Sequence, residues 1–267
     1  MLRKGVVVGI VILVVLGGVA AYVLRPPAAA TGDIEAIPLA VTAVANAPTA
    51  TAVVAATAEP LAAEEAIEAG ATASAPATAA PEPAPTASGG LTIFQINSAG
   101  SQARFELDED LRGSRTTVVG TTNQVAGEVA VDLNDLSQTQ VGIIQINART
   151  LATDNNFRNR AIQNEILDTG AYELITFAPT AITGLPASAA VGETVNFTIE
   201  GNLTIRDITN RVTFAVQATA VSLTQITGTA STIIPRDAYG LTIPSVPNVA
   251  NVEEEVELII AFVAEAA

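Results

Sequence analysis

Two consecutive stretches of the chain, residues 195–205 and 212–220, alternate apolar and polar side chains, and no other feature restricts the fold as strongly. An alternation with period two places successive side chains on opposite faces of a β-strand. A polar turn predicted at residues 207–210 joins the two stretches. The sequence therefore predicts a long antiparallel hairpin with one apolar face, which another part of the protein has to cover.

Short alternating or apolar stretches also recur along the rest of the C-terminal two thirds of the chain, and each predicts a further strand. These stretches are residues 92–96, 103–107, 125–133, 142–148, 174–177, 227–234 and 252–262. Only residues 156–167 have a helical pattern, because Phe157, Ile162 and Ile166 recur every four or five positions. About eight or nine strands with one short helix indicate an all-β barrel or sandwich.

Residues 1–25 predict a transmembrane anchor, or a signal segment that stays uncleaved. Residues 5–24 are apolar throughout, and a helix of about 20 residues spans roughly 30 Å, the hydrocarbon thickness of a bilayer. Arg3 and Lys4 place the N-terminus in the cytoplasm by the positive-inside rule. We therefore expect a single-pass protein of the cell membrane with its domain outside. Cleavage after the alanines at 28–30 is the alternative and would give a secreted protein.

The composition changes again near the start of the strand pattern. Residues 26–90 are mostly Ala, Thr, Pro and Glu, so they bury too little apolar surface to offset the entropy of ordering. We expect a disordered linker that acts as a stalk. Residues 91–267 form the predicted folded domain and are long enough for a substantial core.

The composition excludes several classes of function. The chain has no cysteine and no histidine, which removes disulfides, thiol chemistry and the commonest general base and zinc ligand. A net charge of −15 opposes binding to nucleic acid, whose phosphates favour basic surfaces. The sequence contains no Gly-x-Ser-x-Gly motif and no glycine-rich phosphate loop. We therefore predict no catalytic residue, no metal site and no enzymatic activity.

A few charged or polar residues are candidates for contact with a ligand headgroup. Arg158 and Arg160 on the predicted helix, and Tyr239 near a strand end, could lie at the mouth of a barrel. Alternatively, the arginines pair with Asp154 or Glu165, and the tyrosine packs structurally.

An acidic run at residues 106–110 also has two interpretations. It could hold a hydrolytic carboxylate pair or a calcium ion, but it lacks the regular oxygen spacing and glycine turn of a calcium loop. Paired acid–base work needs a defined separation of carboxylates across a cleft. We interpret the run as a solvated strand end.

Several segments of the folded domain resemble the YceI-like family of polyisoprenoid-binding proteins. Residues 199–216, IEGNLTIRDITNRVTFAV, are similar to the central hairpin of that family. Residues 153–177 resemble its Asn-x-x-Arg helix and the Tyr-x-x-Ile-x-Phe strand that follows. Residues 233–241, IIPRDAYGL, resemble its Arg-x-x-Phe-Gly-Leu segment. The resemblance covers residues 91–267 and none of the first 90 residues.

The resemblance implies an eight-stranded antiparallel barrel of the lipocalin-like kind, with an internal tunnel. It implies binding of an isoprenoid, a quinone or a fatty acyl chain, with no separate cofactor. Many members carry histidines where this chain has Gly100 and Ala161, so no histidine-dependent haem or metal role is implied. The residues expected to line the tunnel are Phe105, Val129, Val131, Ile144, Ile146, Phe197, Ile199, Phe214, Val216, Leu258 and Ile260.

Alternation alone does not separate a hollow interior from a filled one. A β-module with a filled core, displayed on the stalk for adhesion or protein–protein contacts, is therefore the main alternative. A hydrolase that uses the acidic strand ends is a third hypothesis. The partners expected from the sequence are a lipid and the membrane, without nucleic acid. The oligomeric state stays open, a dimer included.

Overall fold

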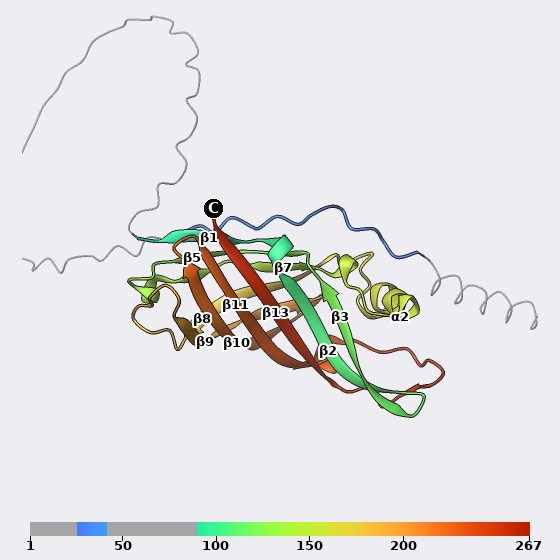
Figure 1. Ribbon diagram of the computed structural model, residues 1–267. Helices are drawn as coiled ribbons and strands as arrows, with labels where there is room; N and C mark the ends of the chain where they lie inside the picture. Colours follow the sequence, from blue (N-terminus) through green and yellow to red (C-terminus); the bar gives the residue numbers. More distant parts are fainter. Residues whose placement is uncertain (1–25, 42–89) are drawn as a thin grey trace, which may run out of the picture. The chain divides into compact units, whose positions relative to one another are not determined.

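The computed structural model describes residues 26–41 and 90–267 of the chain (Figure 1). The predicted anchor, residues 1–25, and residues 42–89 of the predicted linker lie outside the described residues. Within the described ranges, no helix has the length and apolar character needed to cross a membrane. We call residues 26–41 the strap and residues 90–267 the domain.

Strands make up most of the domain and belong to one sheet. The strands are β1 (Thr92–Ile96), β2 (Gln102–Leu111), β3 (Ser114–Thr122), β4 (Val125–Ala126), β5 (Glu128–Val131), β6 (Gln140–Val141), β7 (Ile144–Asn147), β8 (Leu174–Thr183), β9 (Thr194–Ile205), β10 (Ile208–Ser222), β11 (Gln225–Pro235), β12 (Val249–Ala250) and β13 (Glu255–Ala266). The helical elements are α2 (Asn156–Ala161), the π-helical turn η4 (Ile162–Ile166) and the 3₁₀ turns η1 (Ser98–Gly100), η2 (Leu136–Gln138), η3 (Ala148–Thr150) and η5 (Asp237–Tyr239). The prediction of an all-β domain with one short helix is confirmed.

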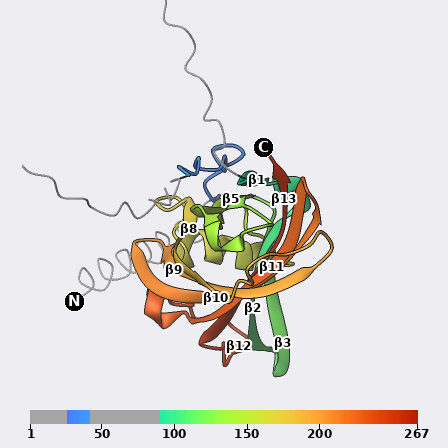
Figure 2. The same cartoon turned by 90° about the vertical axis from the view of Figure 1, so that its left-hand side faces the viewer.

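The sheet curls round an interior. Neighbouring strands pair antiparallel in the order β4–β7–β8–β9–β10–β11–β13–β1–β5–β6, while β2 pairs with β13, β3 and β12. Strand β4 stands at one end of this order, and β5 is the second strand from the other end. Only Gly127 separates β4 from β5 in the chain, so the two ends of the order lie next to each other. In Figure 2, which looks along the domain, the long strands curve round the interior. Strand β3, which sequence analysis missed, has a weak apolar alternation and pairs only with β2.

The central hairpin is the predicted one, but its turn is tighter. Only Arg206 and Asp207 lie between the paired ends of β9 and β10, and Arg206 has a left-handed φ of 58°. The predicted turn at residues 207–210 was therefore wrong in extent. Asn210 continues the strand despite its polarity because its side-chain amide donates to the carbonyl of Ala238 at 2.8 Å.

Gly201 on β9 leaves room for a phenylalanine of the neighbouring strand. A Cβ atom at this position would lie 2.6 Å from ring atoms of Phe177 and 2.6 Å from the carbonyl oxygen of Ala178. We expect Gly201→Ala to lower the free energy of unfolding by about 1–3 kcal/mol, the usual effect of overpacking, as measured by urea denaturation. Asn202→Ala, at the next and exposed position, should change it by less than about 0.5 kcal/mol. Equal unfolding midpoints for the two variants would contradict this account of the packing.

The strap lies along the domain in an extended conformation, within the stretch predicted as a linker (Figure 1). The backbone N–H of Thr31 donates to Glu173 Oε1 at 2.9 Å. Further along the strap, the N–H of Leu39 donates to Glu128 Oε2 at 2.7 Å. The composition gave no sign of this order because the domain's side chains supply the hydrogen bonds that the strap's backbone requires.

We expect the start of the strap to come loose in acid. The backbone N–H of Thr31 lowers the pKa of the Glu173 carboxyl, against the raising effect of burial, and the Thr31 hydroxyl, Asn147 and Arg149 lower it further. A folded-state pKa below the ordinary value means that docking favours the carboxylate. The stabilisation is therefore complete above the ordinary glutamate pKa of about 4.3 and is lost as the pH falls through the lowered value.

The measurement is the NMR shift of the Thr31 amide, followed from neutral pH down into acid. Glu173→Gln provides the comparison, because its amide side chain does not titrate. We expect the acid transition of the Thr31 signal to disappear in that variant. A transition that persists there would show that another group holds the strap.

Candidate functional site

The curled sheet surrounds two apolar cavities. The first, of about 130 Å³, lies at the end formed by the loops at residues 132–139 and 184–193. The second, of about 370 Å³, lies toward α2 and the loop at residues 241–252. Protein interiors normally contain few voids larger than a water molecule. The curled sheet therefore leaves more open space than a tightly packed core does.

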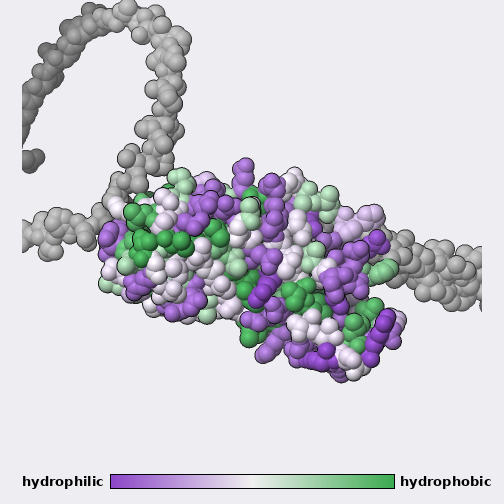
Figure 3. All heavy atoms as spheres, in the orientation of Figure 1, coloured by the Kyte–Doolittle hydropathy of each residue, from purple (hydrophilic) through white to green (hydrophobic). Residues whose placement is uncertain are grey.

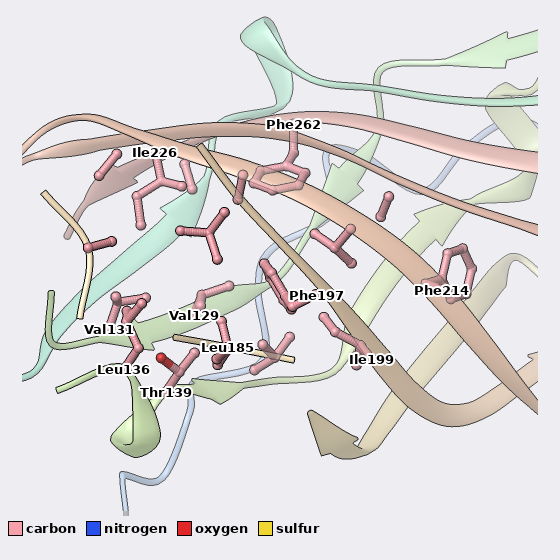
Figure 4. A pocket seen from close by; sticks show the side chains of 18 of the residues that line it. Val129, Val131, Leu136, Thr139, Leu185, Phe197, Ile199, Phe214, Ile226 and Phe262 are labelled. Carbon is pink, nitrogen blue, oxygen red and sulfur yellow. The ribbon is translucent and has the colours of Figure 1, made fainter. Parts of the chain in front are cut away.

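The walls of the first cavity are almost wholly apolar. Side chains from β5, β9, β10, β11 and β13 converge on it (Figure 4). Thr139 and Glu193 are the polar members of its lining. The two loops at this end hydrogen-bond to each other. The N–H of Leu136 donates to the carbonyl of Ala187 at 2.9 Å, and the N–H of Ala189 donates to the carbonyl of Leu133 at 3.0 Å. These bonds tie the two loops together over that end of the cavity.

The second cavity is larger and has an apolar rim. Its lining combines β2, β8, β9 and β13 with α2, η4 and the loop at residues 241–252. At the rim, Phe157 on α2 is 74% exposed and Val246 in the loop is 47% exposed. Figure 3 shows hydrophobic surface gathered near this end, beside the hydrophilic tip of the β2–β3 hairpin. The second cavity therefore has exposed apolar side chains at its rim.

An aromatic pair lies between the two cavities. Phe177 of β8 and Phe214 of β10 line both cavities, and so does Ile260 of β13. The two rings meet edge to face, with centroids 4.9 Å apart and an interplanar angle of 67°. Phe177 and Phe214 thus form a partition across the interior.

All of the residues predicted to line a tunnel lie in the walls of these cavities. The first cavity is lined by Val129, Val131, Ile144, Phe197, Ile199 and Val216, the second by Phe105, Ile146 and Leu258, and both by Phe214 and Ile260. The period-two pattern located them because alternate residues of a strand in a curled sheet face its interior. Their contact with a ligand stays a prediction.

Other residues that were not predicted from the sequence complete the walls. Leu203 and Ile205 have the same phase as the predicted residues of β9, so the same pattern could have selected them. Phe177 was noted only as part of a strand. Ile162 of η4 and Leu185 of the loop after β8 carry no such signal, because tertiary packing decides which side of a helix or loop meets the cavity.

Arg158 lies in the lining of the second cavity, but its charge is already compensated. Its Nη2 lies 2.9 Å from Glu109 Oε1 and its Nη1 lies 2.7 Å from Asp154 Oδ1. The pair with Asp154 is the structural alternative raised from the sequence. Glu109 is 6% exposed, so the interpretation of the acidic run as a solvated strand end was wrong for this residue. A guanidinium held by two carboxylates offers little attraction to an anionic headgroup.

The other two headgroup candidates do not line either cavity. Arg160 is half-buried on α2, and Tyr239 in η5 is 1% exposed. Burial raises the pKa of the Tyr239 hydroxyl. Among the residues that the structure describes, no cluster of acidic side chains could hold a metal ion.

A curled antiparallel sheet round an apolar interior defines a class of all-β proteins with a lipocalin-like fold. The sequence model of the YceI-like domain matches residues 94–264, so the chain belongs to the YceI-like family. No curated protein matches the sequence.

Two solved structures have the same fold at low sequence identity. One is a polyisoprenoid binding domain from Saccharophagus degradans implicated in plant cell wall breakdown, with a TM-score of 0.53 and 13% identity, covering 65% of this chain and 98% of that chain. The other is BcnA of Burkholderia cenocepacia, with a TM-score of 0.50 and 19% identity, covering 63% of this chain and 98% of that chain. At these identities the likeness concerns the fold alone.

Proposed function

We propose that the domain binds a hydrophobic or amphiphilic lipid, such as an isoprenoid, a quinone or a fatty acyl chain, inside an eight-stranded lipocalin-like barrel. The observation that carries the proposal is the pair of apolar cavities that meet at the Phe177–Phe214 partition. The strand count follows if β1–β2, β3–β4–β5 and β6–β7 are three interrupted strands beside β8, β9, β10, β11 and β13. The Saccharophagus degradans relative, described as a polyisoprenoid binding domain, supports the ligand class.

The mechanism is enclosure without chemistry. Each methylene group transferred from water to an apolar wall contributes about 0.8 kcal/mol, so a long chain binds well without a charged anchor. Ordering the chain and immobilising the ligand oppose this gain. The chain has neither histidine nor cysteine to act as base or nucleophile, which favours a binding protein over an enzyme.

Native mass spectrometry of the full chain, extracted from membranes in mild detergent, tests the proposal. We expect an added mass of a lipid and uptake of a fluorescent lipid. Ala161→Trp at the second cavity should reduce both, because the indole fills space that the ligand needs. Ala215→Trp, on the exposed face of β10, is the matched control. Only the apo mass, together with no uptake of the fluorescent lipid, would refute lipid binding.

We further propose that the domain is exported and held close to the membrane by its predicted anchor. The predicted span ends at Leu24, and the carbonyl of Ala29 in the strap accepts from Arg149 Nη1 at 3.2 Å. Five residues reach at most about 18 Å. A docked strap therefore makes the tether short instead of a long stalk. This short tether supports a position in which the apolar rim at Phe157 faces the bilayer.

Tryptophan reporters test this position, because the natural sequence has no tryptophan. Phe157→Trp in the full chain, reconstituted into phosphatidylcholine vesicles, should show blue-shifted emission and quenching by brominated lipids. Leu223→Trp, in the turn between β10 and β11, is the control at a site that is 71% exposed. Failure of the protein to float with vesicles would refute the tether. If the protein floats with the vesicles but the brominated lipids quench both reporters equally, the proposal that the rim faces the bilayer is refuted.

A further inference from the structure

Thr139 places a single hydroxyl in the apolar wall of the first cavity. Its Oγ1 is buried and has no hydrogen-bond partner among the described residues. The residue follows η2, and its backbone N–H donates to the carbonyl of Leu136 at 3.1 Å, which fixes its position. Figure 4 shows the side chain near Leu136 and Val131, with its oxygen among the carbons of the lining.

An unpartnered buried hydroxyl is unfavourable, and a valine of the same shape would avoid this cost. A bound water does not resolve it easily, because a buried water needs two to four polar partners. Besides Thr139, this lining contains one other polar residue, Glu193, whose Oε2 accepts from the N–H of Ala190 at 2.9 Å. A polar atom of a ligand in the first cavity would supply such a partner.

We propose that the hydroxyl of Thr139 binds an uncharged polar group of the lipid, such as a hydroxyl, a ketone or an ester carbonyl. The apolar chain then extends from Thr139 toward the Phe177–Phe214 partition. An ionised group is disfavoured because no cationic side chain lines the first cavity and burying an unpaired charge is costly. The inference rests on the proposed lipid binding and narrows its ligand to neutral amphiphiles.

The test compares wild-type full chain with Thr139→Val, using hexadecanol, hexadecane and hexadecanoate as probes. We expect Thr139→Val to weaken hexadecanol binding about five- to ten-fold, the effect of one hydrogen bond, and to leave hexadecane binding unchanged. Thr139→Ser keeps the hydroxyl and should restore the affinity for hexadecanol. Ser137→Ala on η2, outside both cavity linings, is the control for damage to the loop.

An equal loss for hexadecanol and hexadecane in Thr139→Val would assign the residue a packing role and overturn the inference. Tighter binding of hexadecanoate than of hexadecanol by the wild type would overturn the preference for an uncharged group. If the wild type binds none of the probes, lipid binding itself fails, whereas retained hexadecane binding with no effect at Thr139 refutes only the hydroxyl's role.

Discussion

Phe214→Ala is expected to lower the free energy of unfolding by about 3–5 kcal/mol, the usual effect of truncating a buried phenylalanine. Phe214 is 4% exposed, and the substitution removes its contacts with the cavity wall and its edge-to-face contact with Phe177. Removing this ring also joins the two cavities into one. We therefore expect the variant to accept longer acyl chains than the wild type does.

Urea denaturation measures the first effect, and native mass spectrometry with saturated alcohols of increasing length measures the second. Phe157→Ala is the matched control for stability, because that ring is 74% exposed and its truncation should cost less than about 0.5 kcal/mol. An unchanged limit on chain length in a folded Phe214→Ala variant would show that the two rings do not divide the interior.

Glu109→Gln is expected to destabilise the protein by about 3 kcal/mol. Breaking a buried ion pair typically costs about 3–5 kcal/mol because the remaining charge is left uncompensated. We place the effect at the lower end, since Arg158 keeps Asp154 as a second partner and its side chain is 20% exposed. The pair also joins β2 to α2, so the loss should loosen this wall of the second cavity.

Glu106→Gln is the control on the same strand. Its pair with Arg104 is more exposed, with side-chain exposures of 27% and 44%, and exposed pairs contribute about 0–1 kcal/mol. Urea denaturation of both variants, and of Glu109→Gln combined with Arg158→Met, checks the assignment. Additive effects in that double variant would show that Glu109 and Arg158 are not coupled.

Much of the fold and most of the cavity wall could be predicted, because strand alternation is a local property. Phe197 and Ile199 were found in this way, and they lie in the first cavity as expected. Glu109 was misjudged because its partner Arg158 is far away in the sequence. The strap likewise has hydrogen-bond partners, such as Glu173, that lie in the distant domain.

The sequence by itself determined the all-β class, the inward phase of the central hairpin and the absence of histidine and cysteine chemistry. These follow from side-chain type and period two, which need no knowledge of neighbours. Only the tertiary structure showed that the interior is hollow, that Phe177 and Phe214 divide it, and that Thr139 leaves a hydroxyl in its wall. The reason is physical: a void and an unpaired hydroxyl are properties of what surrounds a residue, and strands distant in the sequence supply those surroundings.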